Sequence, residues 1–116
     1  MSLETRDGQI LEHIVDYCEQ IQATVQRFGD SYDTYQSDFI FRNATALCIL
    51  QIGELVGNLT DEFKSAHSDI PWRQIKAVRN IIAHHYGSID ADVSWDIIMD
   101  DIPRLKDYCR KQLNET

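Results

Sequence analysis

The sequence contains few of the residues that break or bend a chain, with two prolines and five glycines among 116 residues. It also lacks a long uninterrupted apolar run, because the longest one, residues 44–52, contains Thr45 and Gln51. A helix that crosses a membrane needs about 20 mostly apolar residues, so no membrane span is predicted. The first residues do not resemble a secretory signal peptide, which has a basic region followed by an apolar one, so we expect a cytoplasmic protein with no membrane partner.

Cysteine is also scarce, and the positions of the cysteines argue against a disulfide framework and against a metal site. The three cysteines, Cys18, Cys48 and Cys109, are an odd number and form neither a CxxC pair nor a Cys/His ligand spacing. Each lies within an apolar helical pattern, so we interpret all three as small core side chains in a reducing compartment. The sequence therefore predicts no disulfide framework, no metal and no other cofactor.

Positive charge is in short supply, since 11 Lys and Arg face 19 Asp and Glu. This balance excludes a general nucleic-acid coat protein, because phosphate contacts supply most of the affinity of such proteins. Residues 71–89, here called the cation-only segment, contain Arg73, Lys76 and Arg79 and no carboxylate. They leave 8 Lys and Arg against 19 Asp and Glu in the rest of the chain. The segment predicts a local anion site, although an acid-free stretch of this length could also arise by chance.

Apolar residues recur every three or four positions, which predicts an all-α protein. A first helix is expected at about residues 7–28, and a second one at about residues 37–59, with Ser37 as its N-cap. The second helix is apolar on almost every side, so it should lie at the centre of a bundle or in a subunit interface. Gly53 and Gly57 share one of its faces, where another helix could approach closely.

The remaining helices are marked by their end signals. Thr60 should cap a short segment that ends at residue 66, Pro71 should open the next helix, and Asp90 should cap the last one. Pro103 must kink that last helix or start a fresh turn, and residues 31–36 are expected to form a loop or a single turn. With no repeat or linker, residues 1–116 are predicted to be one domain, an up-and-down bundle of four to five helices.

The string RNIIAHHYG, which begins at Arg79, carries the most specific pattern in the chain. Four residues separate Arg79 from His84, and Tyr86 follows two positions later, giving R-x4-H-x-Y. In this pattern the chain resembles the HepT-like branch of the HEPN ribonucleases. The resemblance extends over nearly the whole chain, through Arg42–Asn43, LCILQIGEL at residues 47–55, PWRQIKAVRN at residues 71–80, and Val93, Trp95, Asp96 and Ile97.

The resemblance implies a HEPN fold, a homodimer and a metal-independent endoribonuclease that is the toxin of a toxin–antitoxin pair. It further implies that Tyr86 receives AMP from a cognate nucleotidyltransferase antitoxin, which would place bulk and negative charge where RNA phosphate must sit. Two other functions stay open. The chain could be a non-catalytic helical module that binds a nucleotide or a partner protein, or a substrate and regulator of a toxic nucleotidyltransferase.

The spacing of the motif limits how a catalytic site could form. Five residues on an ideal helix give about 140° of rotation and about 7.5 Å of rise, so Arg79 and His84 of one chain do not point at the same atom unless the helix unwinds at its end. Asn80 and His84 do share a face. Two copies related by a two-fold axis could bring both motifs to one cleft.

In such a cleft each motif residue would have a chemical role in the attack of an RNA 2′-OH on its adjacent phosphate. Histidine exchanges protons near neutral pH, so His84 would act as an acid or base. Arg79 would stabilise the charge on the phosphate. Asn80 could orient His84 or donate to the phosphate.

Four more residues are candidates for supporting roles. Arg73 and Lys76 lie one or two turns before Arg79 and could contact the RNA backbone, as could His85, which neighbours the motif histidine. Glu54 lies in the apolar second helix, where an unpaired carboxylate is costly, so it could hold Arg79 or Arg73 in place. The plainer alternatives are a solvated helix face for the cations and a partly exposed interface carboxylate for Glu54.

The motif residues have plainer interpretations as well. Arg79 could be an ordinary ion-paired helix residue, His84 could be a cation favoured by the helix C-terminus, and Tyr86 could be a packing residue. Trp72 and Trp95 are expected to be core residues and not platforms for stacked bases. The family resemblance favours the catalytic assignments.

Overall fold

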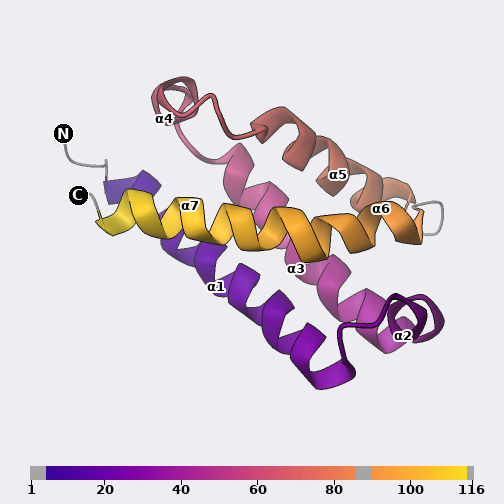
Figure 1. Cartoon of the computed structure of the whole chain (residues 1–116). Helices are drawn as coiled ribbons and strands as arrows, with labels where there is room; N and C mark the ends of the chain where they lie inside the picture. The colour runs from indigo at the N-terminus through magenta and orange to yellow at the C-terminus, as the bar shows by residue number, and fades with distance from the viewer. Residues whose placement is uncertain (1–4, 86–89, 115–116) are drawn as a thin grey trace.

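The computed structural model describes residues 5–85 and 90–114, and within these residues it contains helices and no strand (Figure 1). The predicted all-α bundle is confirmed. Three helical segments run on without a break from Ala91 to Asn114, so the long units are α1, α3, α5 and this last run. The elements are α1 (Thr5–Phe28), α2 (Tyr32–Ser37), α3 (Phe39–Gly57), α4 (Asp61–Ala66), α5 (Trp72–His85), α6 (Ala91–Asp96), the π-helical η2 (Ile97–Asp101) and α7 (Ile102–Asn114).

The long helices are arranged around α3. This helix packs against α1 on one side and against α5 on the other, and α7 packs against α1 (Figure 1). In the view of Figure 1, α7 crosses in front of α3, while the short helices α2 and α4 lie at opposite ends of α3. The predicted central place of the second helix is confirmed, and the buried apolar residues of α3 pack against these neighbours.

The core is built from the apolar stripes that the sequence predicts. Its fully buried side chains come from four helical segments, with Leu11, Ile14, Cys18 and Ile21 in α1, Phe41, Thr45, Ile52 and Val56 in α3, Ile98 in η2, and Cys109 in α7. All three cysteines are buried and free, and both tryptophans pack against the core, as predicted. Burial raises the pKa of the Cys18 and Cys109 thiols to about 12, so both are protonated and unreactive at neutral pH.

The start of α1 is tied to the turn before α4 by a buried carboxylate. Thr60 caps α4 as predicted, since its Oγ1 accepts a hydrogen bond from the Phe63 N–H at 3.1 Å. The N–H and hydroxyl of Thr60 in turn donate to Asp7, at 2.9 and 2.7 Å. Asp7 is thereby satisfied in a place where an unpaired charge would be costly. The predicted N-cap at Asp90 is also confirmed.

The second helix begins later than predicted. Its N-cap is Asp38 and not Ser37, because Asp38 Oδ1 accepts from the N–H groups of Ile40 at 2.9 Å and Phe41 at 3.3 Å. Ser37 instead ends α2, where its hydroxyl donates to the Asp33 carbonyl at 2.9 Å.

Residues 31–36, predicted as a loop or single turn, belong mostly to the short helix α2, which Ser31 caps. This helix is held by Tyr35, whose buried hydroxyl shares a hydrogen bond of 2.7 Å with Ser94. The Tyr35 ring also packs against Trp95. A contact across 59 residues therefore decides the conformation of a segment that has weak local signals.

Pro103 neither breaks nor simply kinks the last helix. The helix widens just before it, where the Ile102 N–H donates to the Ile97 carbonyl five residues back, and α7 starts afresh from that π turn. Because proline has no N–H to donate, a wider turn at this point accommodates the missing bond.

One helix segment, Phe39–Asn58, is long and apolar enough to cross a membrane when judged by length and composition. The central helix of a folded bundle passes the same test, and α3 contacts α1 and α5 here. We therefore describe α3 as the central helix of the bundle.

Candidate active site

The motif helix α5 presents two different faces. Ile82 is buried on the side that packs against the bundle, and Ile75 and Val78 are partly buried there. The opposite side is exposed and carries Arg73, Lys76, Asn80 and His84, which are three or four residues apart. The four predicted polar residues of this helix thus share one solvent-facing side.

Arg79 differs from these residues because it lies against α3. A Cβ built on Gly53 would overlap Cβ and Cγ of Arg79 and would lie 3.5 Å from its Cα. Only glycine allows α3 to approach α5 this closely at that point. The predicted close approach is correct at Gly53 and wrong at Gly57, where a Cβ would meet nothing within 4 Å, because an open groove lies there.

The guanidinium of Arg79 is held on two sides. Its Nη2 forms an ion pair with Glu54 Oε1, and its Nη1 donates to Asn80 Oδ1 at 2.9 Å. The Arg79 side chain is 28% exposed and that of Glu54 48%, so the pair lies at the edge of the bundle. Of the two partners predicted for Glu54, the structure places it against Arg79.

Arg79 still has hydrogen-bonding capacity to offer an anion. A guanidinium carries five N–H donors, and two of these are used by Glu54 and Asn80. Its buried Nε has no hydrogen-bond partner among residues 5–85 and 90–114. The arrangement orients a permanent positive charge and leaves part of its donor fork available.

His84 is exposed in the last turn of α5, one turn beyond Asn80. The structure thus brings Arg79, Asn80 and Glu54 together and places His84 on the solvent-facing side, away from the α3 contact of Arg79. Tyr86, the predicted modification site, lies outside the described residues, and so does the side chain of His85. No three His, Cys, Asp or Glu side chains in the described part of the chain are close enough to hold a metal ion.

A groove between α5, the end of α3 and α4 lies beside the start of the motif helix. It has a volume of about 470 Å³, and Arg73 and Lys76 line it as expected for neighbours on one side of a helix. Lys64 of α4 lines it too. No sequence pattern marks Lys64, because it lies outside the cation-only segment and only the fold brings it near Arg73. We call this feature the basic groove.

The exposed side of α3 carries large apolar side chains. Phe39, Ile40 and Leu47 are 63%, 55% and 58% exposed, and their spacing places them on one side of the helix with Glu54. We call this side the α3 stripe. A shallow groove beside it, lined by Asn43, Ala46, Leu47, Leu50, Ile82 and Ala83, runs between α3 and the second half of α5.

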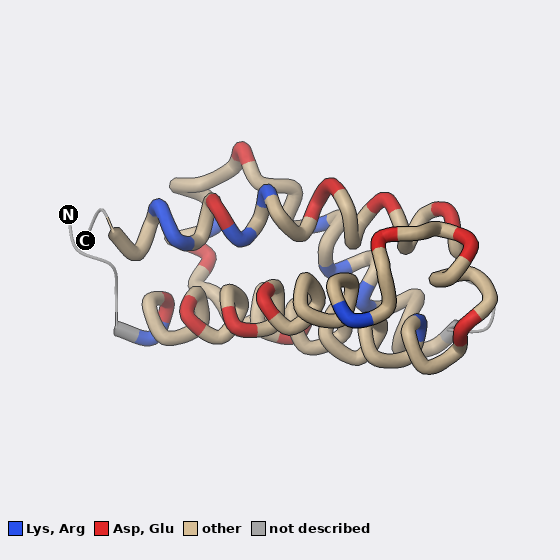
Figure 2. Tube along the Cα trace, turned by 60° about the horizontal axis from the view of Figure 1, so that its bottom comes forward, with Lys and Arg blue, Asp and Glu red and all other residues tan. Residues whose placement is uncertain are grey.

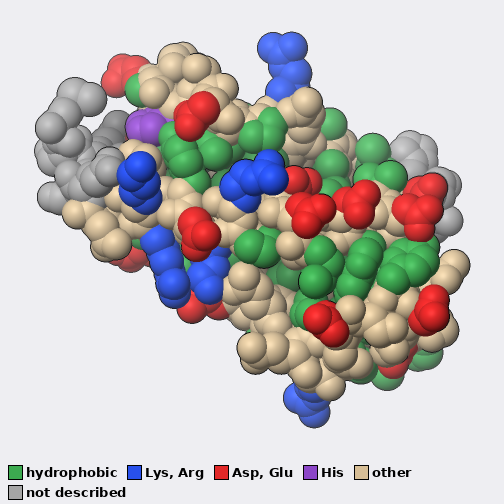
Figure 3. Space-filling model, viewed as in Figure 1, with side chains coloured by type: hydrophobic (Ala, Val, Ile, Leu, Met, Phe, Trp, Pro, Cys, Tyr) green, Lys and Arg blue, Asp and Glu red, His purple; other side chains and the backbone are tan. Residues whose placement is uncertain are grey.

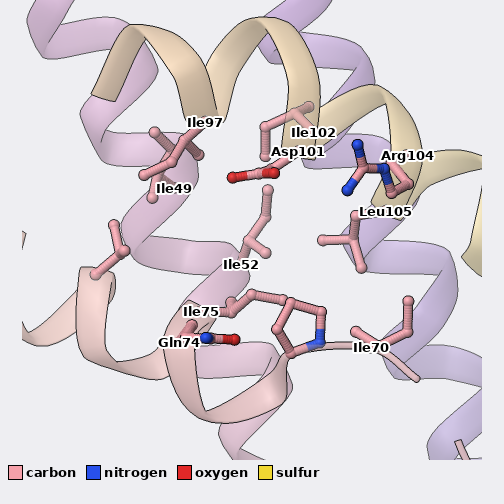
Figure 4. Close-up of a pocket in the computed structure, with 12 residues that line it drawn as sticks. Ile49, Ile52, Ile70, Gln74, Ile75, Ile97, Asp101, Ile102, Arg104 and Leu105 are labelled. Carbon is pink, nitrogen blue, oxygen red and sulfur yellow. The ribbon is translucent and has the colours of Figure 1, made fainter. Parts of the chain in front are cut away.

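A smaller hollow of about 110 Å³ lies on the other side of α5, towards η2 and α7 (Figure 4). Its walls are mostly apolar side chains from α3, from the start of α5 with the turn before it, and from the last helical run, and Asp101, Arg104 and Gln74 also line it. The lining marks it as an incompletely filled part of the core.

Charge is distributed unevenly over the rest of the molecule. Acidic residues recur along α1 and are dense in residues 90–101, while α7 carries Lys and Arg along its length, together with Asp107 (Figure 2). In Figure 3, which shows the face with α7 in front, apolar side chains lie on both sides of these charges. Acidic residues accompany the cations on these faces, whereas α5 has no Asp or Glu, so an anion site is favoured on α5.

A family model described as Ribonuclease HepT-like matches residues 14–112. The chain belongs to the HepT-like ribonuclease family. The predictions of this family and of a ribonuclease are confirmed at that level.

Several relatives of this HepT-like chain are named as RNases. One from Caldanaerobacter subterraneus subsp. tengcongensis is 31% identical over 105 residues, which cover 90% of this chain and 92% of that protein. A protein named as ribonuclease HepT from Thermococcus cleftensis is 29% identical, with 78% and 87% covered. A longer protein of Methanocaldococcus jannaschii, named as both a gamma-glutamylcyclotransferase and an RNase, is 30% identical, and the match covers 90% of this chain and 46% of that protein. No solved structure matches the chain.

Proposed function

We propose that this HepT-like chain is a metal-independent endoribonuclease that acts as the toxin of a toxin–antitoxin pair. One observation carries the proposal. Arg79 is fixed against α3 by Gly53, Glu54 and Asn80, whereas the histidine of the same motif is exposed for a substrate. An arginine that only stabilises the fold would not require an exposed histidine in the same motif, whereas catalysis would use both side chains.

The reaction is the attack of an RNA 2′-OH on the adjacent phosphorus. The 2′-oxygen–phosphorus bond forms as the bond from phosphorus to the 5′-oxygen breaks, which gives a 2′,3′-cyclic phosphate and a 5′-OH. His84 either removes the proton of the attacking 2′-OH or supplies the proton that the leaving 5′-oxygen gains, and water takes part in the other transfer. Such an acid or base is typically worth about 10² to 10⁴ in rate. The remaining N–H donors of Arg79 stabilise the charge that builds on the phosphate oxygens.

The proposed site is composite, because Arg79 and His84 of one copy lie on different sides of α5. Arg79 faces α3 and His84 faces solvent on the same helix. A second copy, related by a two-fold axis, would bring its own His84 to the Arg79 of the first. Each dimer then holds two equivalent sites.

The α3 stripe supports such a dimer. Burial of a large apolar side chain is worth about 1.5 to 3 kcal/mol, so three exposed ones on a single helix are a strong incentive for association. Glu54 continues the same side of α3, so a partner seated on this stripe would lie beside the Arg79 pair. Arg79 would then be at the edge of the interface.

Neutralisation is proposed to act at Tyr86, two residues beyond His84. An AMP group on its hydroxyl would add a phosphate and a nucleoside beside the site. The added negative charge would repel the RNA phosphate from Arg79. A nucleotidyltransferase is the partner that this chemistry requires.

The test uses the purified chain, a defined RNA and an excess of chelator. The parent should leave 2′,3′-cyclic phosphate ends, and His84→Ala and Arg79→Ala should each lose at least about 10²-fold in rate. His13→Ala, which removes an exposed histidine of α1, is the matched control and should cleave like the parent. Equal cleavage by the His84→Ala variant and the parent would overturn the proposal.

The neutralisation step has its own test. Treatment with the nucleotidyltransferase and ATP should stop cleavage by the parent but not by Tyr86→Phe, which lacks the acceptor hydroxyl. Inhibition of both forms would show that AMP transfer to this tyrosine is not the mechanism.

A further inference from the structure

The basic groove brings together three cations from two helices. Lys64 of α4 and Arg73 and Lys76 of α5 line it, while Val56 and Trp72 contribute its apolar part. No Asp or Glu is among its lining residues. Trp72 is fixed there, because its Nε1–H donates to the His67 carbonyl at 3.0 Å. The groove is therefore a shaped surface of one charge sign, although the chain as a whole carries a formal charge of −8.

The cations of the groove are free to meet a ligand. Arg73 and Lys76 are exposed. Lys64 has an acidic neighbour, Asp61, but the two charged groups are 3.9 Å apart and the carboxylate is fully exposed. Ion pairs of that kind contribute little, so they offer weak competition to a phosphate.

The basic groove and the proposed catalytic site share one exposed side of α5. Arg73, Lys76, Asn80 and His84 occupy one exposed side of α5, at intervals of three or four residues. His84 follows Arg73 by eleven positions, which is about 16 Å along a helix that rises about 1.5 Å per residue. A chain of phosphates that leaves His84 along α5 would arrive at the groove after a few nucleotides.

We propose that the basic groove binds the phosphate backbone of the RNA strand whose scissile bond lies at His84, an inference that rests on the proposed ribonuclease function. Grooves that hold single strands without sequence preference combine a row of cations with an aromatic or apolar surface, as this one does. Three cations are few enough to be occupied by the phosphates of a single strand, so the proposed ligand is single-stranded. The substrate is then an RNA that extends several nucleotides to one side of the cleaved bond.

This proposal predicts a dependence on RNA length and on salt. A dinucleotide reaches only His84 and Arg79, so long RNAs should be cleaved with a higher kcat/KM. For single strands, a plot of log affinity against log salt concentration has a slope of about −0.7 for each phosphate contact. Three contacts in the groove therefore contribute about −2 to the slope.

The experiment measures binding and cleavage separately. Binding of poly(U) is followed over a range of salt concentrations in a His84→Ala background, so that the probe stays intact. The test variant replaces Lys64, Arg73 and Lys76 by Gln. The matched control loses the same three charges at exposed positions elsewhere, at Arg27, Arg104 and Lys111. Circular dichroism confirms that both variants are folded, and cleavage of poly(U) and of the dinucleotide UpA is compared with an active His84.

The groove variant should show a salt slope smaller by about 2 and a smaller preference for poly(U) over UpA, while the control keeps both properties of the parent. Equal slopes for the two variants would overturn the proposal. So would binding of poly-glutamate with the same dependence on the groove cations, because the groove would then fit an acidic protein. If groove-dependent poly(U) binding is found but the parent cleaves no RNA, the RNA groove stands and the proposed nuclease activity fails.

Discussion

Substitution of Gly53 by Ala tests how Arg79, the proposed catalytic arginine, is positioned. The added Cβ would overlap Cβ and Cγ of Arg79, so α5 must move away from α3 or the Arg79 side chain must rotate. Gly57→Ala is the matched control. It lies one turn later on the same side of α3, and its added Cβ would meet nothing within 4 Å.

The sizes of the two effects follow from opposing contributions. Replacing Gly by Ala inside a helix gains up to about 1 kcal/mol, whereas forcing a methyl group into occupied space costs about 1 to 3 kcal/mol. Gly57→Ala should therefore be neutral or stabilising, and Gly53→Ala should be less stable than Gly57→Ala by about 1 to 3 kcal/mol. For a chain of this size a difference of 1 kcal/mol shifts the Tm by about 4 °C.

Activity should separate the two variants further than stability does. A misplacement of about 1 Å at a catalytic group can cost about 10²-fold in rate, so Gly53→Ala should lose RNA cleavage at temperatures where it is fully folded. Calorimetry measures the Tm of each variant, and cleavage of a defined RNA measures its rate. If Gly53→Ala matched Gly57→Ala in both Tm and rate, the contact with Gly53 would not be what holds Arg79.

Three further predictions concern the bundle itself. Asp7→Ala removes the acceptor of two hydrogen bonds from Thr60, so urea unfolding should show a loss of about 2 to 3 kcal/mol, and an unchanged midpoint would contradict that. Burial raises the pKa of Cys18 and Cys109 from 9.0 to about 12, so these thiols lose their protons at a lower pH in the unfolded chain than in the folded one. Their contribution to the free energy of unfolding is therefore complete below pH 9.0 and should fall between pH 9.0 and about 12. Urea midpoints that fell equally in the double Ala variant would refute this origin. Val78→Ile puts one more methylene, worth about 0.8 kcal/mol, into the hollow of Figure 4 and should raise the Tm, whereas a lower Tm would mean that the hollow cannot accept it.

Local signals predicted most of the fold. The N-caps at Thr60 and Asp90 were predictable because a capping side chain needs only the N–H groups two or three residues ahead of it. Ser37 and Asp38 satisfy that rule equally well, and the choice between them depends on α2. That helix is held by the bond from Tyr35 to Ser94, which no local pattern reveals.

The candidate site was predictable to a similar depth. The cost of leaving Glu54 unpaired indicated a cationic partner, and the structure supplies Arg79. The spacing of Gly53 and Gly57 indicated a close helix contact but not which glycine makes it, since that depends on where α3 and α5 diverge. Lys64 joins the basic groove only through the fold. The helix geometry of the motif points to a second copy, but one chain does not contain the contacts that such a copy would make.

The central claim is that Arg79 of one copy and His84 of another act on the same phosphodiester. Its most direct test is to mix Arg79→Ala and His84→Ala chains, unfold and refold them together, and measure RNA cleavage. Random pairing makes half of the dimers mixed, each with one intact site of two, so activity should recover to about a quarter of the parent value from two inactive variants. If mixed dimers form but cleave no better than either variant alone, the two residues do not act across a dimer.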